Sequence, residues 1–117
     1  MFNRSAITLF AKQPMLDWIN HVETQLSKTS NFQPTLNEIN SDRTVYLLPP
    51  TIEDEADLDK WLKKNFSKIF ELVLEESYLI EEQWPKKRTY TMFKQWFTVE
   101  QFGIIEDLTS LPFINED

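Results

Sequence analysis

The clearest helical pattern in the chain, and the starting point for its fold, is Leu58-Asp-Lys-Trp-Leu-Lys-Lys-Asn-Phe-Ser-Lys-Ile-Phe-Glu-Leu-Val73. Its apolar residues recur at spacings of one, three and four, so they lie along one face of an α-helix. Acidic residues crowd the sequence just before it, where the helix dipole favours negative charge, and Thr51 or Asp54 is placed to cap the first turn. We therefore predict an amphipathic helix over about residues 53–77.

A strand and another helix are predicted upstream of this segment. Residues 4–10 are rich in strand-forming side chains and end in an apolar run, which predicts a first strand. Pro14 suits the first turn of a helix, because its missing N–H would have no intrahelical partner there. One helical face then collects five apolar residues, which predicts a helix over residues 14–27. These residues are Met15, Trp18, Ile19, Val22 and Leu26.

The middle and last parts of the chain predict two further strands. Residues 43–48 form the second strand, which ends at two prolines that cannot donate to a sheet. The loop before it, residues 28–42, has one predicted helical turn around residues 35–39. A third helix is predicted over residues 89–97.

Residues 98–108 fit a strand and a helix almost equally well. Gly103 weakens the helix interpretation, and Thr98-Val99 favours extended chain. We predict a third strand here, with Gly103 as a candidate bulge.

These elements predict an α+β fold, in which a small three-stranded sheet packs against about three helices in a two-layer sandwich. A chain of 117 residues is long enough for one compact domain, which we place at residues 1–109. Residues 110–117 are predicted to be an acidic C-terminal tail.

The composition excludes several classes of chemistry. The sequence has no cysteine, which excludes disulfides, thiolate catalysis and cysteine-ligated metal centres. Its single glycine excludes the glycine-rich loops that hold phosphate groups. No apolar run approaches the roughly 20 residues that span a bilayer, and no signal peptide is apparent, so we expect a cytoplasmic protein. We expect no cofactor.

Negative charge is concentrated in one segment. The chain carries a formal charge of −7, and residues 53–82 hold ten acidic residues against four lysines. Such a patch repels nucleic-acid backbones and anionic membranes, and it attracts basic proteins. We therefore expect a protein partner with a basic surface, no membrane association and no nucleic acid.

Two polar groupings have candidate chemical roles. Asp17 and His21 are four residues apart on one helix, so the carboxylate can orient the imidazole as a general base. A solvated surface pair is the interpretation that we prefer. Five acids near the start of the long helix are candidate ligands of a divalent cation, but the segment lacks the glycine of an EF-hand loop. These acids are Glu53, Asp54, Glu55, Asp57 and Asp59. Acids at that position also suit the helix dipole, so we expect no metal.

Residues 84–102 combine six aromatic residues with the basic run Lys86-Lys87-Arg88. Such a mixture can bind single-stranded nucleic acid through stacking and phosphate contacts. The alternative, which the overall negative charge favours, is that the aromatic rings belong to the core. Trp84, before Pro85, either anchors a protein partner or folds back over the end of the sheet; we prefer the second.

Several stretches together resemble a group of small, acidic, uncharacterised bacterial proteins of about this length with no assigned function. The stretches are Arg4-Ser-Ala-Ile-Thr8, Lys12-Gln13-Pro14 with Leu16-Asp17-Trp18, Asp42-Arg-Thr-Val-Tyr-Leu-Leu-Pro49, and Trp84-Pro-Lys-Lys-Arg-Thr-Tyr90 with Met92-Phe93 and Trp96-Phe97. The resemblance implies a bacterial cytoplasmic protein of one domain. It implies no activity and no site.

The sequence thus favours a non-catalytic protein-interaction module, such as an inhibitor or adaptor that presents an acidic helix to a basic partner. The predicted partner-binding residues are Glu53, Asp54, Glu55, Asp57, Asp59, Trp84, Lys86, Lys87 and Arg88. One alternative is a small metal-independent enzyme that uses carboxylates, with or without His21. Another is a single-stranded nucleic-acid binder through residues 84–102. The two predicted surfaces are the acidic helix over residues 53–77 and the loop over residues 84–88. Because they have opposite charge, two copies of the chain can bind head to tail, so both a monomer and a homodimer are compatible with the sequence.

Overall fold

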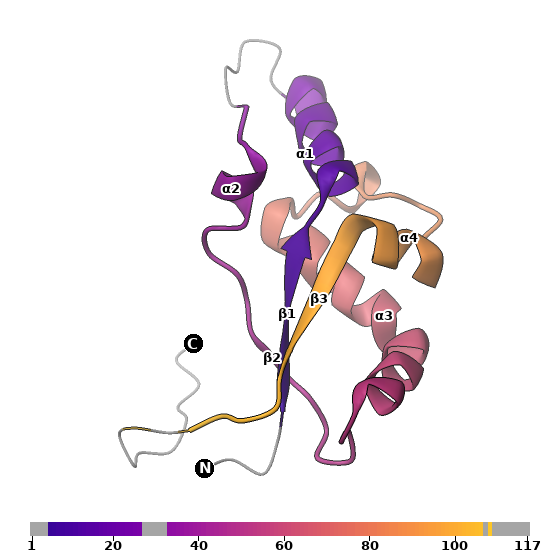
Figure 1. The fold of residues 1–117 in the computed structure, drawn as a ribbon. Coiled ribbons are helices and arrows are strands. Elements are labelled where there is room, and N and C mark those ends of the chain that lie inside the picture. The colour runs from indigo at the N-terminus through magenta and orange to yellow at the C-terminus, as the bar shows by residue number, and fades with distance from the viewer. Residues whose placement is uncertain (1–4, 27–32, 107, 109–117) are drawn as a thin grey trace.

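The computed structural model describes residues 5–26, 33–106 and 108 (Figure 1). Its elements follow the order β1 (Ala6–Ala11), α1 (Gln13–Leu26), α2 (Leu36–Ile39), β2 (Tyr46–Leu47), α3 (Glu55–Ser77), the 3₁₀ turn η1 (Glu81–Gln83), α4 (Tyr90–Trp96) and β3 (Phe97–Phe102). The acidic tail predicted for residues 110–117 lies outside the described residues. No helix among the described residues is both long and apolar enough to cross a bilayer.

The three strands form an antiparallel sheet in the order β2-β1-β3, which confirms the predicted α+β fold. The long helix α3 crosses behind the sheet in Figure 1, and α1 and α4 lie at the upper end of β1 and β3. The short helix α2 stands apart and leads into β2. It corresponds to the single helical turn that was predicted around residues 35–39, so three larger helices cover the sheet.

Strand alternation determines which face of the sheet carries the core. Ile7 and Leu9 of β1 point to one face of the sheet, and so does Phe97 of β3. All three side chains are buried. Thr8 and Phe10 point to the opposite face, where the Thr8 hydroxyl donates to the carbonyl oxygen of Thr44 at 3.0 Å. The helices therefore pack against the face that carries Ile7 and Leu9.

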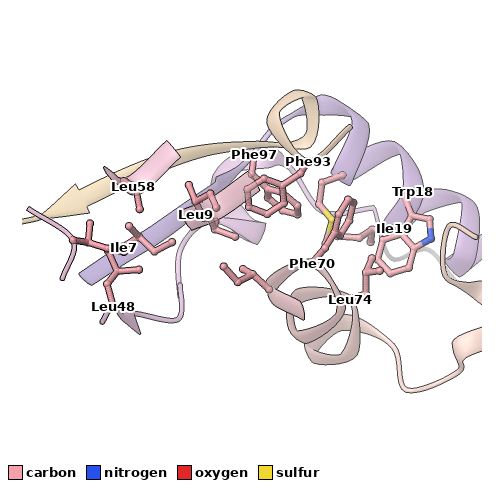
Figure 2. Packing of buried hydrophobic residues seen from close by; sticks show 14 of the residues in the cluster. Ile7, Leu9, Trp18, Ile19, Leu48, Leu58, Phe70, Leu74, Phe93 and Phe97 are labelled. Atoms are coloured by element: carbon pink, nitrogen blue, oxygen red, sulfur yellow. The ribbon is translucent and has the colours of Figure 1, made fainter. Parts of the chain in front are cut away.

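Phe70 of α3 lies at the centre of the core and is fully buried (Figure 2). Its ring centroid is 5.9 Å from that of Phe93, 5.4 Å from Trp96 and 5.5 Å from Phe97. These contacts join α3 to α4 and to the start of β3. The aromatic residues of the last third of the chain thus pack against the long helix.

Side-chain caps determine where three helices begin. Asp54 accepts a hydrogen bond from the Asp57 N–H and caps α3, as one of the two predicted candidates. Thr89 accepts from the Met92 N–H and caps α4. Thr35 and Glu38 form a reciprocal capping box at α2, which satisfies two backbone donors of this one-turn helix.

The second strand is shorter than predicted. Residues 43–48 were predicted as a strand, but only Tyr46 and Leu47 pair with β1. Towards the N-terminal end of this segment, the side chain of Asn40 takes the place of a strand: it accepts from the Ala11 N–H at 2.7 Å and donates to the Ala11 carbonyl at 3.0 Å. A side chain thus satisfies the edge of β1, so the backbone of residues 42–44 need not stay in the sheet.

The third strand ends earlier than predicted. It was expected over residues 98–108, but it covers Phe97–Phe102, and Ile104 beyond it is 74% exposed. The pairing with β1 runs without interruption from Ala11↔Phe97 to Ala6↔Phe102, so Gly103 is not a bulge. The strand stops because β1, its only neighbour among the described residues, has its first paired residue at Ala6.

Replacing Asn40 by alanine is expected to destabilise the protein by about 1–3 kcal/mol, because the backbone N–H and C=O of Ala11 both lose their partner. Chemical denaturation measures the change. The matched control is Asn37→Ala, at an exposed position of α2, the helix that Asn40 caps. We expect it to lower the free energy of unfolding by at most about 0.5 kcal/mol. Equal effects of the two substitutions would contradict this role of Asn40.

Candidate functional site

The five acids predicted to bind a partner lie around the N-terminal end of α3, and three of them have structural roles. Asp54 accepts from the Asp57 N–H at 2.8 Å, and the Asp57 carboxylate accepts from the Glu53 N–H at 3.2 Å. Asp59 accepts from the Tyr90 hydroxyl at 2.7 Å. Glu53 and Glu55 are exposed. Capping and the helix dipole therefore account for most of this cluster.

No group of three or more metal-ligating side chains capable of holding an ion is present in the described part of the chain.

Burial raises the pKa of Tyr90 to about 12, and the nearby Asp59 carboxylate adds to the effect. The Tyr90 hydroxyl therefore remains a hydrogen-bond donor to Asp59, which ties α4 to α3.

The basic run 86–88 divides into one residue bound to the fold and two that are exposed. The guanidinium of Arg88 donates to the Pro85 carbonyl at 2.7 Å and to the Glu71 carboxylate at 2.9 Å. Lys86 and Lys87 are exposed. Arg88 therefore holds the loop before α4 against α3, and only the two lysines are available at the surface.

Trp84 is half-buried and folds back onto the core. Its indole N–H donates to the carbonyl of Tyr78 at 2.8 Å, which places it at the C-terminal end of α3. The indole N–H of Trp18 reaches the neighbouring Gln83 carbonyl at 2.9 Å. Two tryptophans thus hold the η1 segment. Trp84 is not a freely projecting anchor, and it folds against the C-terminal end of α3 and not over the end of the sheet as predicted.

Of the remaining aromatic residues of segment 84–102, Phe102 is 39% exposed, and the other four pack into the core, mainly against rings of α1 and α3. Phe93 and Phe97 are buried, and Tyr90 and Trp96 pack against the core cluster. The rings of Tyr90 and Phe93 stack with their centroids 6.2 Å apart. These rings do not form an exposed platform on which nucleic-acid bases could stack.

Asp17 and His21 do not form the pair that acid–base chemistry requires. His21 is exposed, and Asp17 accepts from the side-chain amide of Gln13 at 2.8 Å. Among residues 5–26, 33–106 and 108, Arg88 and Glu71 form an ion pair, whereas Asp17 and His21 do not. These positions agree with the interpretation of His21 as a solvated surface residue.

A different set of acids surrounds the C-terminal end of α3. Glu75, Glu81 and Glu82 are exposed there and line a hollow of about 280 Å³ together with Leu79 and Trp84. We call these five residues the acidic-apolar surface. Leu79 is 78% exposed, and the neighbouring Ile80 is 43% exposed. The last turn of α3 contains no basic residue.

These acids belong to the acidic segment 53–82, but none of them was among the predicted partner-binding residues. For Glu75 the signal was its place on the helix, because an acid near a C-terminal end opposes the helix dipole, whereas an acid near an N-terminal end is stabilised by it. The hollow itself was not predictable, because it forms only when Trp84 folds against the end of α3.

A larger pocket of about 480 Å³ lies between β1, α1, the C-terminal half of α3 and the segment that leads from α2 to β2. The lining residues are Leu9, Ala11, Met15, Ile19, Glu23, Ile39, Asn40, Asp42, Arg43, Thr44, Tyr46, Val73, Glu76, Ser77, Tyr78 and Phe97.

Comparison of the chain with family models, with curated proteins and with solved structures finds no match. The bacterial cytoplasmic origin implied by the resemblance stays a prediction. Any functional argument therefore depends on the surfaces described above.

Proposed function

We propose that the protein is a non-catalytic interaction module, an inhibitor or adaptor, that presents the acidic-apolar surface to a basic protein partner. The observation that carries the proposal is the position of Glu75, Glu81 and Glu82 around an exposed leucine and a hollow. The acidic helix expected from the sequence is retained, but its C-terminal end becomes the recognition surface. We also propose a cytoplasmic location, which the cysteine-free sequence supports.

The charge of this surface has no evident structural purpose. Glu75 lies in the last turns of α3, where a negative charge costs about 0.3–1 kcal/mol through the helix dipole. Within the described part of the chain, the side chains of Glu75, Glu81 and Glu82 form no hydrogen bond or ion pair with one another or with other residues. A basic partner would neutralise this cluster and complement the dipole as well.

The apolar residues define the kind of partner. Leu79 is the more exposed of the two hydrophobic residues between α3 and η1, and Trp84 forms a wall of the hollow beside it. A basic amphipathic helix presents apolar side chains next to lysine or arginine, which matches this combination. An acidic surface of this kind can cover the basic active site of an enzyme or the basic face of an adaptor target.

The proposal is tested with a fluorescently labelled, basic amphipathic helical peptide, whose binding is followed by anisotropy. We expect saturable binding that weakens as salt is raised, and a loss of at least about tenfold in affinity for the variant E75Q/E81Q/E82Q. Circular dichroism verifies that the variant is folded, as expected for three exposed positions.

The matched control removes charge at the other end of the helix. Glu53 and Glu55 are exposed acids of the same segment, so E53Q/E55Q is expected to change the affinity by less than about twofold. If both variants weaken binding equally, the interaction depends on net charge alone and the proposed surface is wrong. Absence of binding by the wild-type protein would also contradict the proposal.

A further inference from the structure

The pocket beside β1 has an apolar floor. Leu9, Met15, Ile19 and Phe97 are buried residues that line it, and Val73 of α3 adds to the same wall. Leu9, Phe97 and Ile19 come from β1, β3 and α1, so three elements contribute to this lining. A volume of about 480 Å³ falls within the range of about 300–1,000 Å³ that is typical of small-molecule sites.

The pocket exists because the edge of β1 is only partly paired. The Lys12 N–H bonds to the Trp96 carbonyl, so the even-numbered residues of β1 direct their backbone groups towards β3 and the odd-numbered ones towards β2. Ile7 pairs with Tyr46, and Ala11 is bound by Asn40. Leu9, between them, lies in the pocket wall.

Three of the ionisable side chains that line the pocket are acidic, beside one arginine and two tyrosines. Glu23, Asp42 and Glu76 line it from three different segments. Arg43 also contributes to the lining, but its guanidinium carbon lies 3.5 Å from the centroid of the Phe10 ring. Because Phe10 points to the sheet face opposite Leu9, the positive charge of Arg43 is held away from the apolar floor.

Two of the three carboxylates are held in place by hydroxyl groups. The Tyr78 hydroxyl donates to Glu23 at 2.6 Å, and the Thr44 hydroxyl donates to Glu76 at 2.8 Å. Burial raises the pKa of Tyr46 to about 12, with the charge of Glu76 adding to it, and burial and Glu23 raise the pKa of Tyr78. The raised pKa values keep the two tyrosines neutral, and the Tyr78 hydroxyl remains a donor to Glu23.

We propose that this pocket binds a small organic amine, with its apolar body on the floor formed by Leu9, Ile19 and Phe97 and its ammonium group at Glu23 and Glu76. Fixed carboxylates accept the hydrogen bonds of an ammonium group, and the neighbouring tyrosine rings add cation–π attraction. An anionic ligand would meet three acidic residues and is rejected. This site is separate from the acidic-apolar surface and does not depend on the function proposed for it.

The test titrates the full-length protein with phenethylamine and, in parallel, with its neutral analogue phenethyl alcohol and the anion hydrocinnamate. Two-dimensional amide NMR reports both affinity and location. We expect saturable shifts at residues around the pocket with the amine, and at least about tenfold weaker binding of the alcohol and the anion. Equal binding of the three compounds would overturn the charge assignment. If none of them binds, the proposed site is wrong.

Two pairs of variants locate the binding. In E23Q/E76Q the side-chain oxygens still accept the two hydroxyl bonds while both charges are removed, so amine binding should fall at least about tenfold; E53Q/E55Q is the charge-matched control. Ser77→Phe places a ring at an exposed pocket position and should abolish binding, whereas Ser67→Phe on the exposed side of the same helix should not. Unchanged affinity in both pocket variants would overturn the proposal.

Discussion

Replacing Phe70 by alanine is expected to destabilise the protein by about 3–5 kcal/mol. Phe70 is fully buried and its ring contacts Phe93, Trp96 and Phe97, so the substitution leaves a cavity where α3, α4 and β3 meet. A domain of this size has a total stability of about 5–15 kcal/mol, so the variant should unfold at a much lower urea concentration than the wild type. Urea denaturation followed by tryptophan fluorescence measures the loss.

The control for this experiment is Leu72→Ala, two residues further along the same helix. Leu72 is 40% exposed, so its removal creates no comparable cavity and should cost less than about 1 kcal/mol. A similar cost at both positions would show that α3 does not pack in the orientation described here.

Raising the pH is expected to destabilise the folded protein steeply between pH 10 and about 12. The pKa of Tyr46 and that of Tyr90 are each raised from 10.0 to about 12, chiefly by burial, and the pKa of Tyr78 is raised as well. In this window the unfolded chain loses tyrosine protons that the folded protein retains. Because the unfolded state then binds fewer protons, the free energy of unfolding falls as pH rises. The stabilisation is fully present below pH 10.

The measurement is a series of urea denaturation curves below, within and above this pH window, with tyrosinate absorbance recorded in parallel. In Tyr46→Phe and Tyr90→Phe the stability should decline less steeply with pH, although each variant starts from a lower stability if its hydroxyl bond contributes about 0.5–1.5 kcal/mol. The same slope in wild type and both variants would show that these hydroxyls do not cause the alkaline loss.

Much of the fold was predictable from local patterns. The apolar spacing that contains Leu58 and Phe70 predicted α3, and Asp54 was one of two candidate caps. Periodicity and capping depend on residues a few positions apart, so they can be read without knowledge of the fold. The ends of β2 and β3 were predicted less well, because a strand ends where its neighbour stops pairing, and that depends on distant residues such as Asn40.

The candidate sites were less predictable than the fold. The sequence indicated which segment is acidic, but capping by Asp54 and the bond from Tyr90 to Asp59 assign structural roles to part of it. The unexplained acids, such as Glu81, became apparent only where Trp84 folds against the end of α3.

The sequence by itself determined the helices, the approximate strands, the negative charge and the absence of thiol and phosphate-loop chemistry, because these depend on composition and on short-range spacing. Only the tertiary structure decided which acids remain unused, and that Glu23 and Glu76, 53 positions apart in the chain, line one pocket. Such a pocket arises from the packing of elements that are distant in sequence, and no local pattern records how they meet.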